Sequence, residues 1–214
     1  MATQFQVLSQ SLIKLNNTYL EQLLLNRKVV RNYKKINNFD TSKLDNIAKY
    51  SIKIPTAGFS RGVEILQVNS IETIKKIASI FNEDIYLKKN YLPWISNSVS
   101  LFFIFVDEDA YHSRYSLSDK NKSVNSNDWD IPYWYVDSGS AIMNCMLLIE
   151  EQELKSGFMG LHSIQRSEVH KLLKIPNKYT IIGFVTAGVE NQNNTLSRKH
   201  LKKKKLTHYE KYSK

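Results

Sequence analysis

The sequence has almost no cysteine and no long hydrophobic run. Cys145 is its single cysteine, so no intrachain disulfide can form and a reducing, cytoplasmic setting is expected. No apolar run reaches the roughly 18 residues that a membrane-spanning helix needs. The amino terminus also lacks the basic start and apolar centre of a secretory signal. We therefore expect no membrane span and no secretion, and we expect Cys145 to be a small buried side chain.

Common catalytic motifs are missing as well. The sequence contains no GxGxxG after a strand, no GxxxxGK[ST] phosphate loop and no GxSxG nucleophile elbow. Its five histidines, at positions 112, 162, 170, 200 and 208, lack the spacing of metal ligands, so no metal is expected. These absences exclude most common enzyme classes and leave chemistry that a bound cofactor carries itself.

Positive charge, in contrast, is abundant and clustered. The formal net charge is +10, and basic residues gather at 27–35 and again at 198–205. Such clusters can bind a phosphate-bearing cofactor, a nucleic acid or an anionic surface, or they can simply be solvated. A helix-turn-helix, a zinc site and an RNA-binding signature are all missing, so nucleic acid is the less favoured partner.

Hydrophobic periodicity predicts helices and strands in mixed order. Helices are predicted at residues 19–26, 40–52, 71–81, 109–115 and 166–173, and a long helix is predicted after Pro132. Strands are predicted at 63–68, 99–106, 156–161 and 179–187. Because these elements do not alternate strictly as βαβ units, the pattern favours an α+β fold. Residues 1–17 are expected to form an N-terminal extension, 18–214 a single domain, and 116–130 a long mobile loop.

The long helix is apolar almost all round between Ala141 and Ile149. Such a helix must be buried on more than one side, either within the chain or against a partner subunit. The strand that follows contains Gly157 and Gly160, which let a flat ligand approach its backbone.

Five stretches, in matching order, resemble the FMN-dependent nitroreductase family. The first, NRKVVRNY at 26–33, is similar to the family's opening RR-S-x-R-x-F pattern. The resemblance implies that Arg27, Lys28, Val29 and Arg31 hold the phosphate and ribityl chain of FMN. Arginine suits this role because a phosphate accepts bidentate guanidinium contacts. Lys28 replaces the usual Arg or His, and Val29 replaces a common Ser.

The second stretch, PTAGFSRGV at 55–63, is similar to the family's P-S-x-x-N-x-Q-P-W loop. In the family's dimers this loop reaches the flavin held mainly by the other subunit. The resemblance implies flavin contacts from Pro55, Thr56, Ala57, Gly58, Phe59 and Arg61. Phe59 replaces the usual Asn and Arg61 the usual Gln, a departure that resembles the FMN-binding domain of deazaflavin γ-glutamyl ligases. Arg61 would bind either the flavin pyrimidine or a substrate anion.

The third stretch comprises 110–115, 119–120 and 128–129, and it resembles the same subgroup. There the segment covers the substrate side of the flavin, which suits planar or anionic substrates. Together with the start of the fourth stretch, it implies a substrate side made of Tyr111, His112, Tyr115, Trp129 and Tyr133.

The fourth stretch, PYWYVDSGSA at 132–141, matches the family's PYWY-x-D-x-G-x-A pattern at the start of its central helix. In the family this helix packs in the dimer interface. The following strand would lie along the isoalloxazine edge, with backbone contacts near Gly157, Met159, Gly160 and Leu161. The fifth stretch, at 196–199 and 208–212, resembles the C-terminal arm, with Arg198, and after it Lys199, as the late phosphate ligand.

The resemblance implies a nitroreductase-like α+β fold: a central, mixed but mainly antiparallel sheet, flanking helices, a buried central helix and an extended C-terminal arm. It also implies a homodimer with flavin at the interface. The expected activity is FMN-dependent transfer of hydride or electrons from reduced nicotinamide (NAD(P)H) or deazaflavin to a small planar acceptor, in a ping-pong mechanism without a protein nucleophile. Two alternatives stay open: a module that binds nucleic acid or an anionic surface through the basic C-terminal arm, and a flavin storage or sensing protein.

Overall fold

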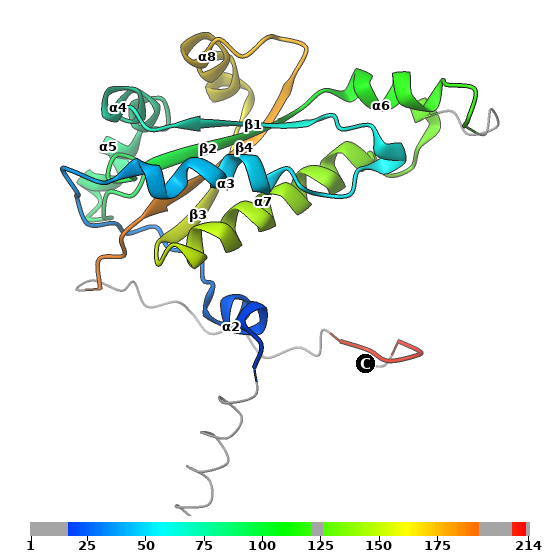
Figure 1. The fold of residues 1–214 in the computed structure, drawn as a ribbon. Helices are drawn as coiled ribbons and strands as arrows, with labels where there is room; N and C mark the ends of the chain where they lie inside the picture. The colour runs from blue at the N-terminus through cyan, green and yellow to red at the C-terminus, as the bar shows by residue number, and fades with distance from the viewer. Residues whose placement is uncertain (1–16, 121–125, 193–206, 213–214) are drawn as a thin grey trace, which may run out of the picture.

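The computed structural model describes residues 17–120, 126–192 and 207–212. The fold is built around one sheet (Figure 1). The sheet has four strands in the order β1-β2-β4-β3. They are β1 (Val63–Val68), β2 (Ser100–Val106), β4 (Thr180–Gly188) and β3 (Lys155–Gly160). Each neighbouring pair is antiparallel. A parallel bridge between Val29 and Ser156 adds a short segment beside β3. The predicted α+β class is therefore confirmed.

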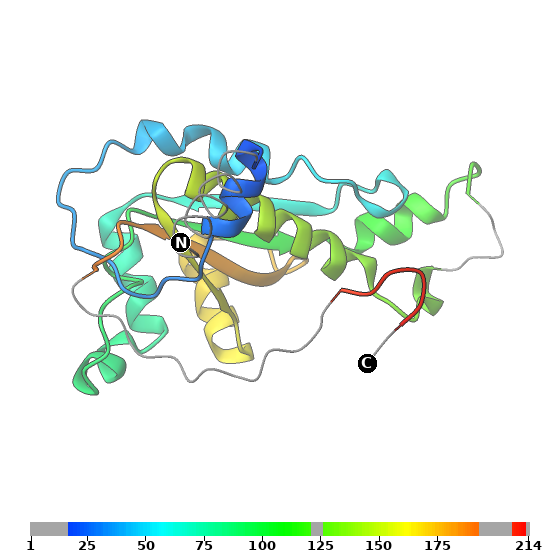
Figure 2. The same ribbon diagram turned by 90° about the horizontal axis from the view of Figure 1, so that it is seen from below.

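Helices cover both faces of the sheet, as Figure 1 shows. On one face lie the long helix α7 (Tyr133–Glu151) and α3 (Asp45–Ser51), and on the other lie α4 (Ile71–Ile80) and α8 (Ser163–Leu173). The helix α6 (Glu108–Tyr115) and the short helix α5 (Glu83–Lys88) lie at opposite ends of the molecule (Figures 1 and 2). The helix α2 (Tyr19–Asn26) packs beside α7. Among the described residues, no helix combines the length and hydropathy that crossing a membrane requires.

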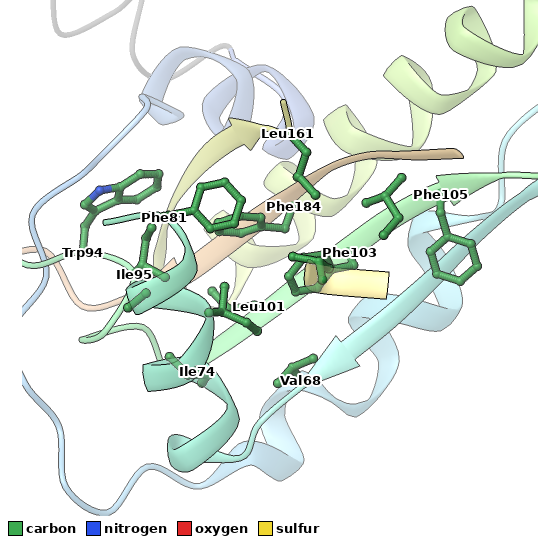
Figure 3. Close-up of a cluster of buried hydrophobic side chains, with 14 of the residues drawn as sticks. Val68, Ile74, Phe81, Trp94, Ile95, Leu101, Phe103, Phe105, Leu161 and Phe184 are labelled. Carbon is green, nitrogen blue, oxygen red and sulfur yellow. The ribbon is translucent and has the colours of Figure 1, made fainter. Parts of the chain in front are cut away.

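The two-sided cover explains the sequence of the central strand β2. All seven of its residues are buried. Leu101, Phe103 and Phe105 enter the core beneath α4 and α8, while Phe102, Ile104 and Val106 enter the core against α7. Successive residues of a strand point to opposite faces, so a strand covered on both faces must be apolar throughout. Figure 3 shows the first of these cores, where the Phe103 and Phe184 ring centroids are 5.0 Å apart.

Most predicted elements are found close to their predicted ends. Thr18 caps α2 as expected: its hydroxyl accepts from the Glu21 N–H, and the Glu21 carboxylate accepts from the Thr18 N–H. The helix predicted at 40–52 is a 3₁₀ turn, η1 (Thr41–Leu44), followed by α3. The predicted loop at 116–130 contains a second 3₁₀ turn, η3 (Ser126–Asp128), and its residues 121–125 lie outside the described ones. The helix α5 was not predicted.

The long helix is buried on several sides, as predicted. No residue from Ala141 to Ile149 is exposed, and Ala141, Cys145 and Ile149 are completely buried. The sheet covers one side of the helix, and α3 and α2 cover others. Cys145 is a buried apolar side chain, as predicted, and burial raises the pKa of its thiol to about 12. That thiol therefore stays neutral and unreactive near neutral pH.

Candidate active site

A cleft with a volume of about 540 Å³ lies beside the edge strand β3. One wall is formed by residues 28–32 together with Met159 and Glu190. The opposite wall is formed by the end of α4, by α5 and by the loop after it. Its aromatic side chains are Phe81, Tyr86, Tyr91 and Trp94. This volume is within the usual range of sites for small molecules and cofactors.

Backbone pairing holds the basic segment 28–32 in place on this wall. The Val30 N–H donates to the Ser156 carbonyl at 2.8 Å. The Tyr33 hydroxyl lies beneath the segment, donates to the Val30 carbonyl at 3.0 Å and is 2.7 Å from the Thr186 hydroxyl. Burial raises the pKa of Tyr33, so this phenol remains a hydrogen-bond donor. The segment is thereby added to the edge of β3, and it carries its basic side chains to the cleft.

A buried carboxylate organises the opposite wall. Glu83, which is only 3% exposed, accepts from the N–H groups of Trp94, Ile95 and Ser96 at 2.8, 2.7 and 3.0 Å. Hydrogen bonds to an ionised acceptor are about twice as strong as neutral ones, so this carboxylate fixes the loop firmly. The loop then presents the Trp94 ring to Arg31, whose guanidinium carbon is 5.4 Å from the ring centroid. Sequence reasoning missed Glu83 and the aromatic wall.

The three predicted cations of the first stretch differ in their surroundings. Arg31 donates from Nη2 to the Phe158 carbonyl at 3.1 Å and keeps an exposed guanidinium. Lys28 forms an ion pair with Glu190 at 2.8 Å. The Nε atom of Arg27 is buried and has no hydrogen-bond partner within the described part of the chain. A buried guanidinium N–H without an acceptor is unfavourable, and an anionic ligand would relieve it.

The predicted substrate-side residues come together in one aromatic cluster where α6 meets the start of α7. Trp129 is at its centre: its ring centroid is 4.7 Å from Tyr115, 5.1 Å from Tyr133 and 6.1 Å from Trp134. Trp134 in turn contacts the Tyr111 and His112 rings, at 5.9 and 5.5 Å. The sequence predicted that Tyr115, Trp129 and Tyr133 lie with Tyr111 and His112 on the substrate side. Trp134 was part of the predicted helix motif and was not assigned to this group.

Asp137 joins this aromatic cluster to the predicted flavin loop at 55–61. It is 7% exposed, and its Oδ2 atom accepts from the Ala57 N–H at 2.9 Å and from the Tyr111 hydroxyl at 2.8 Å. Burial, and secondly this bond, raise the pKa of Tyr111, so the phenol stays protonated and donates. The loop, whose centre is the 3₁₀ turn η2 (Ala57–Phe59), is thereby held against α6 and α7.

The predicted site residues therefore form two separate groups, which lie apart from each other within one chain. The basic segment, β3 and α5 surround the cleft, whereas the loop at 55–61 and the aromatic cluster lie with α6 (Figures 1 and 2). The predicted phosphate ligands Arg198 and Lys199 lie outside the described residues.

No family model and no curated protein matches the sequence. Solved structures do match. An FMN-dependent nitroreductase from Clostridium difficile is 17% identical with a TM-score of 0.59, over 83% of this chain and 91% of the other. NADPH:FMN oxidoreductase from Vibrio harveyi, in complex with NAD⁺, is 16% identical with a TM-score of 0.64, over 92% of this chain and 79% of the other. The chain has the nitroreductase fold.

A third structure agrees with this assignment. Nitroreductase A from Vibrio parahaemolyticus is 18% identical with a TM-score of 0.62, over 90% of this chain and 79% of the other. Identities this low establish the nitroreductase fold and do not by themselves transfer an activity. They also do not distinguish subgroups, so the resemblance to deazaflavin γ-glutamyl ligases stays a prediction.

Proposed function

We propose that the protein is an FMN-dependent oxidoreductase that transfers hydride or electrons from a reduced nicotinamide or deazaflavin to a small planar acceptor. The observation that carries the proposal is the basic segment 27–31, held against β3 beside a cleft of about 540 Å³. The nitroreductase fold supports it, because structural neighbours include an FMN-dependent nitroreductase and an NADPH:FMN oxidoreductase.

The residues of the cleft fit a phosphate-bearing planar cofactor. The proposed phosphate ligands are Arg27 and Arg31, with Lys28 as a weaker third because Glu190 already pairs with it. Arg31 and Lys28 line the cleft, whereas Arg27 lies next to its lining. Arg27 is proposed as a ligand because its buried Nε lacks an acceptor among the described residues. Arg198 and Lys199 are proposed as further ligands. The aromatic wall with Trp94 and Tyr91 suits the flat ring system.

FMN, when bound, would supply the hydride-accepting and hydride-donating chemistry. The chain would bind and orient it. Backbone N–H groups beside the ring would stabilise negative charge that develops during transfer, because fixed dipoles need no reorganisation. The Gly157 N–H already donates to the Thr186 hydroxyl at 3.1 Å. Because that N–H is already engaged, the backbone contacts to the flavin ring are proposed from Met159 to Leu161 instead. No protein nucleophile is required, and a donor and an acceptor that use the same place in turn would give ping-pong kinetics.

The proposed active unit is a homodimer in which each chain completes the other's site. The flavin loop and the aromatic cluster would cover the cleft of the partner, since they cannot reach the cleft of their own chain. Exposed apolar residues support an interface on α2 and at the start of α7: Tyr19, Leu20, Leu24, Leu25, Tyr135 and Val136. Several exposed apolar side chains on one helix, as on α2, are typical of subunit interfaces.

Leu25→Glu should convert the dimer to a monomer and lower its FMN content. Leu25 is 72% exposed on α2, so the new carboxylate should change the stability of the monomer little. Burying that charge in a subunit interface is costly in free energy. Ile164→Glu is the matched control, because Ile164 is 74% exposed on α8, across the sheet from α7. Sedimentation equilibrium measures the outcome. A wild-type protein that is monomeric at all concentrations would contradict the dimer.

Purified protein should show the paired near-ultraviolet and blue absorbance peaks of flavin, and these should bleach when NADH or NADPH is added anaerobically. Arg27→Ala and Arg31→Ala should each weaken FMN binding about 10- to 150-fold, because a hydrogen bond to a charged group contributes about 1.5–3 kcal/mol. Lys76→Ala should bind FMN normally, since Lys76 pairs with Glu72 on the surface of α4.

The same spectrum separates the alternatives. Peaks that no donor bleaches would favour flavin storage or sensing. A colourless protein that also fails to take up added FMN would contradict the proposal and favour a module that binds nucleic acid or an anionic surface.

A further inference from the structure

The loop that carries Phe59 and Arg61 has an unusual backbone. Gly58, Phe59 and Arg61 have φ values of 61°, 64° and 56°, all in the left-handed region. Side chains with a Cβ atom adopt this region at a cost of roughly 1–3 kcal/mol each, and such strain gathers at functional sites. Glycine would fit all three positions without strain, so the Phe and Arg side chains require an explanation other than turn formation.

The surrounding contacts hold the loop in this strained form. The Ala57 N–H donates to buried Asp137, and the Arg61 N–H donates to the Thr56 hydroxyl at 3.1 Å. A Cβ atom on Gly58 would come within 2.5 Å of the Tyr115 ring, which shows how closely α6 packs on the loop. The loop therefore presents its side chains in one prearranged geometry.

The loop presents the Arg61 guanidinium stacked on the Phe59 ring. The Arg61 guanidinium carbon lies 4.1 Å from the centroid of the Phe59 ring, and Phe59 is 66% exposed. Arg61 is also exposed and forms no ion pair with any described residue. A guanidinium fixed by stacking keeps its forked N–H groups available for a carboxylate or another planar anion.

Neighbouring charges strengthen this positive site. Lys120 Nζ lies 5.2 Å from the centroid of the Tyr115 ring, the ring that packs on Gly58. Two acidic groups of this region pair with cations, Asp119 with Arg114 and Asp107 with Lys178, and Asp137 accepts two hydrogen bonds. Arg61 and Lys120 therefore remain the cations of this region that no described carboxylate pairs with.

We infer that Phe59 and Arg61 form a receptor for the acidic group of the acceptor, and that the acceptor is a planar aromatic anion. This inference rests on the proposed function and names its substrate class. Arg61 is assigned to the acceptor because its guanidinium lies on the exposed Phe59 ring and forms no ion pair with any described residue. A carboxylate presents acceptors alone and matches the fork of Arg61.

The test compares two nitroarenes that differ in charge, 4-nitrobenzoate and 4-nitrobenzamide, as acceptors for the FMN-loaded full chain. Wild type should prefer the benzoate in kcat/KM by about tenfold or more, as expected for a charge-assisted hydrogen bond. Arg61→Gln should abolish that preference, because kcat/KM should fall far more for the benzoate than for the benzamide, and the variant should still bind FMN. Arg61→Gly, which accepts the left-handed backbone freely, should behave in the same way and excludes misfolding as the cause.

A binding measurement accompanies the kinetics. Titration calorimetry with benzoate should show binding that Arg61→Gln weakens about tenfold and that added salt weakens further. Equal kcat/KM for the two nitroarenes in a flavin-loaded wild type would overturn the inference and leave the proposed function intact. A fall in FMN content in Arg61→Gln would overturn it too, because Arg61 would then be a cofactor ligand. If no flavin binds at all, the proposed function fails, and with it the assignment of this site to an acceptor.

Discussion

Gly157→Ala is expected to destabilise the fold by about 1–3 kcal/mol and to abolish most FMN binding, although it adds one methyl group. The new Cβ atom would lie 2.7 Å from the Val30 carbonyl oxygen and 3.1 Å from the Trp94 ring. That oxygen belongs to the backbone and is held by the Tyr33 hydroxyl, so it cannot rotate away. The basic segment would have to leave β3, and Arg27 and Arg31 would move with it.

Gly160→Ala is the matched control on the same strand. A Cβ atom at Gly160 meets nothing within 4 Å, and neither glycine has a left-handed φ. The unfolding free energy of Gly160→Ala should therefore stay within about 0.5 kcal/mol of wild type. Denaturant unfolding measures both variants, and FMN titration measures Gly157→Ala. Normal stability and normal flavin content in Gly157→Ala would show that the docking of the segment 28–32 does not position the cofactor ligands.

The sequence was most informative where local pattern and tertiary burial agree. Residues 99–106 are apolar except for Ser100, and β2 is indeed covered on both faces. Thr18 and Glu21 form the predicted capping box because that motif depends only on neighbours in the chain. The aromatic residues of α6 and α7 were grouped from a family pattern, and their rings do meet around Trp129.

The unpredicted parts depend on contacts between distant residues. The six-residue helix α5 follows Asn82, whose left-handed φ of 53° breaks the helical periodicity. Its importance comes from Glu83, which binds backbone groups 11 to 13 residues further along the chain. A buried glutamate leaves no periodic signal, so pattern reasoning treats it as a surface charge. Likewise, no local pattern reveals that the cleft and the loop at 55–61 lie at opposite ends of the folded molecule (Figure 1).

Asp137→Ala is expected to have the largest effect on the acceptor side. The substitution leaves the Ala57 N–H and the Tyr111 hydroxyl without their acceptor. Each donor left without a partner costs about 1–3 kcal/mol, so the unfolding free energy should fall by about 2–6 kcal/mol. Asp137→Asn should lose less, because its amide oxygen can still accept one of the two bonds.

The same substitution tests whether Asp137 positions the strained loop. Released from Asp137, the loop should relax from its left-handed conformation, so acceptor kcat/KM should fall at least about tenfold while the cleft keeps its FMN. Tyr111→Phe removes one of the two donors, and the double variant with Asp137→Ala should be less destabilised than the sum of the single variants. Thermal unfolding, flavin absorbance and steady-state kinetics measure these three effects. If the losses in unfolding free energy of the two single variants simply added, Tyr111 and Asp137 would act independently. That result would contradict a stabilising role for the 2.8 Å hydrogen bond between them.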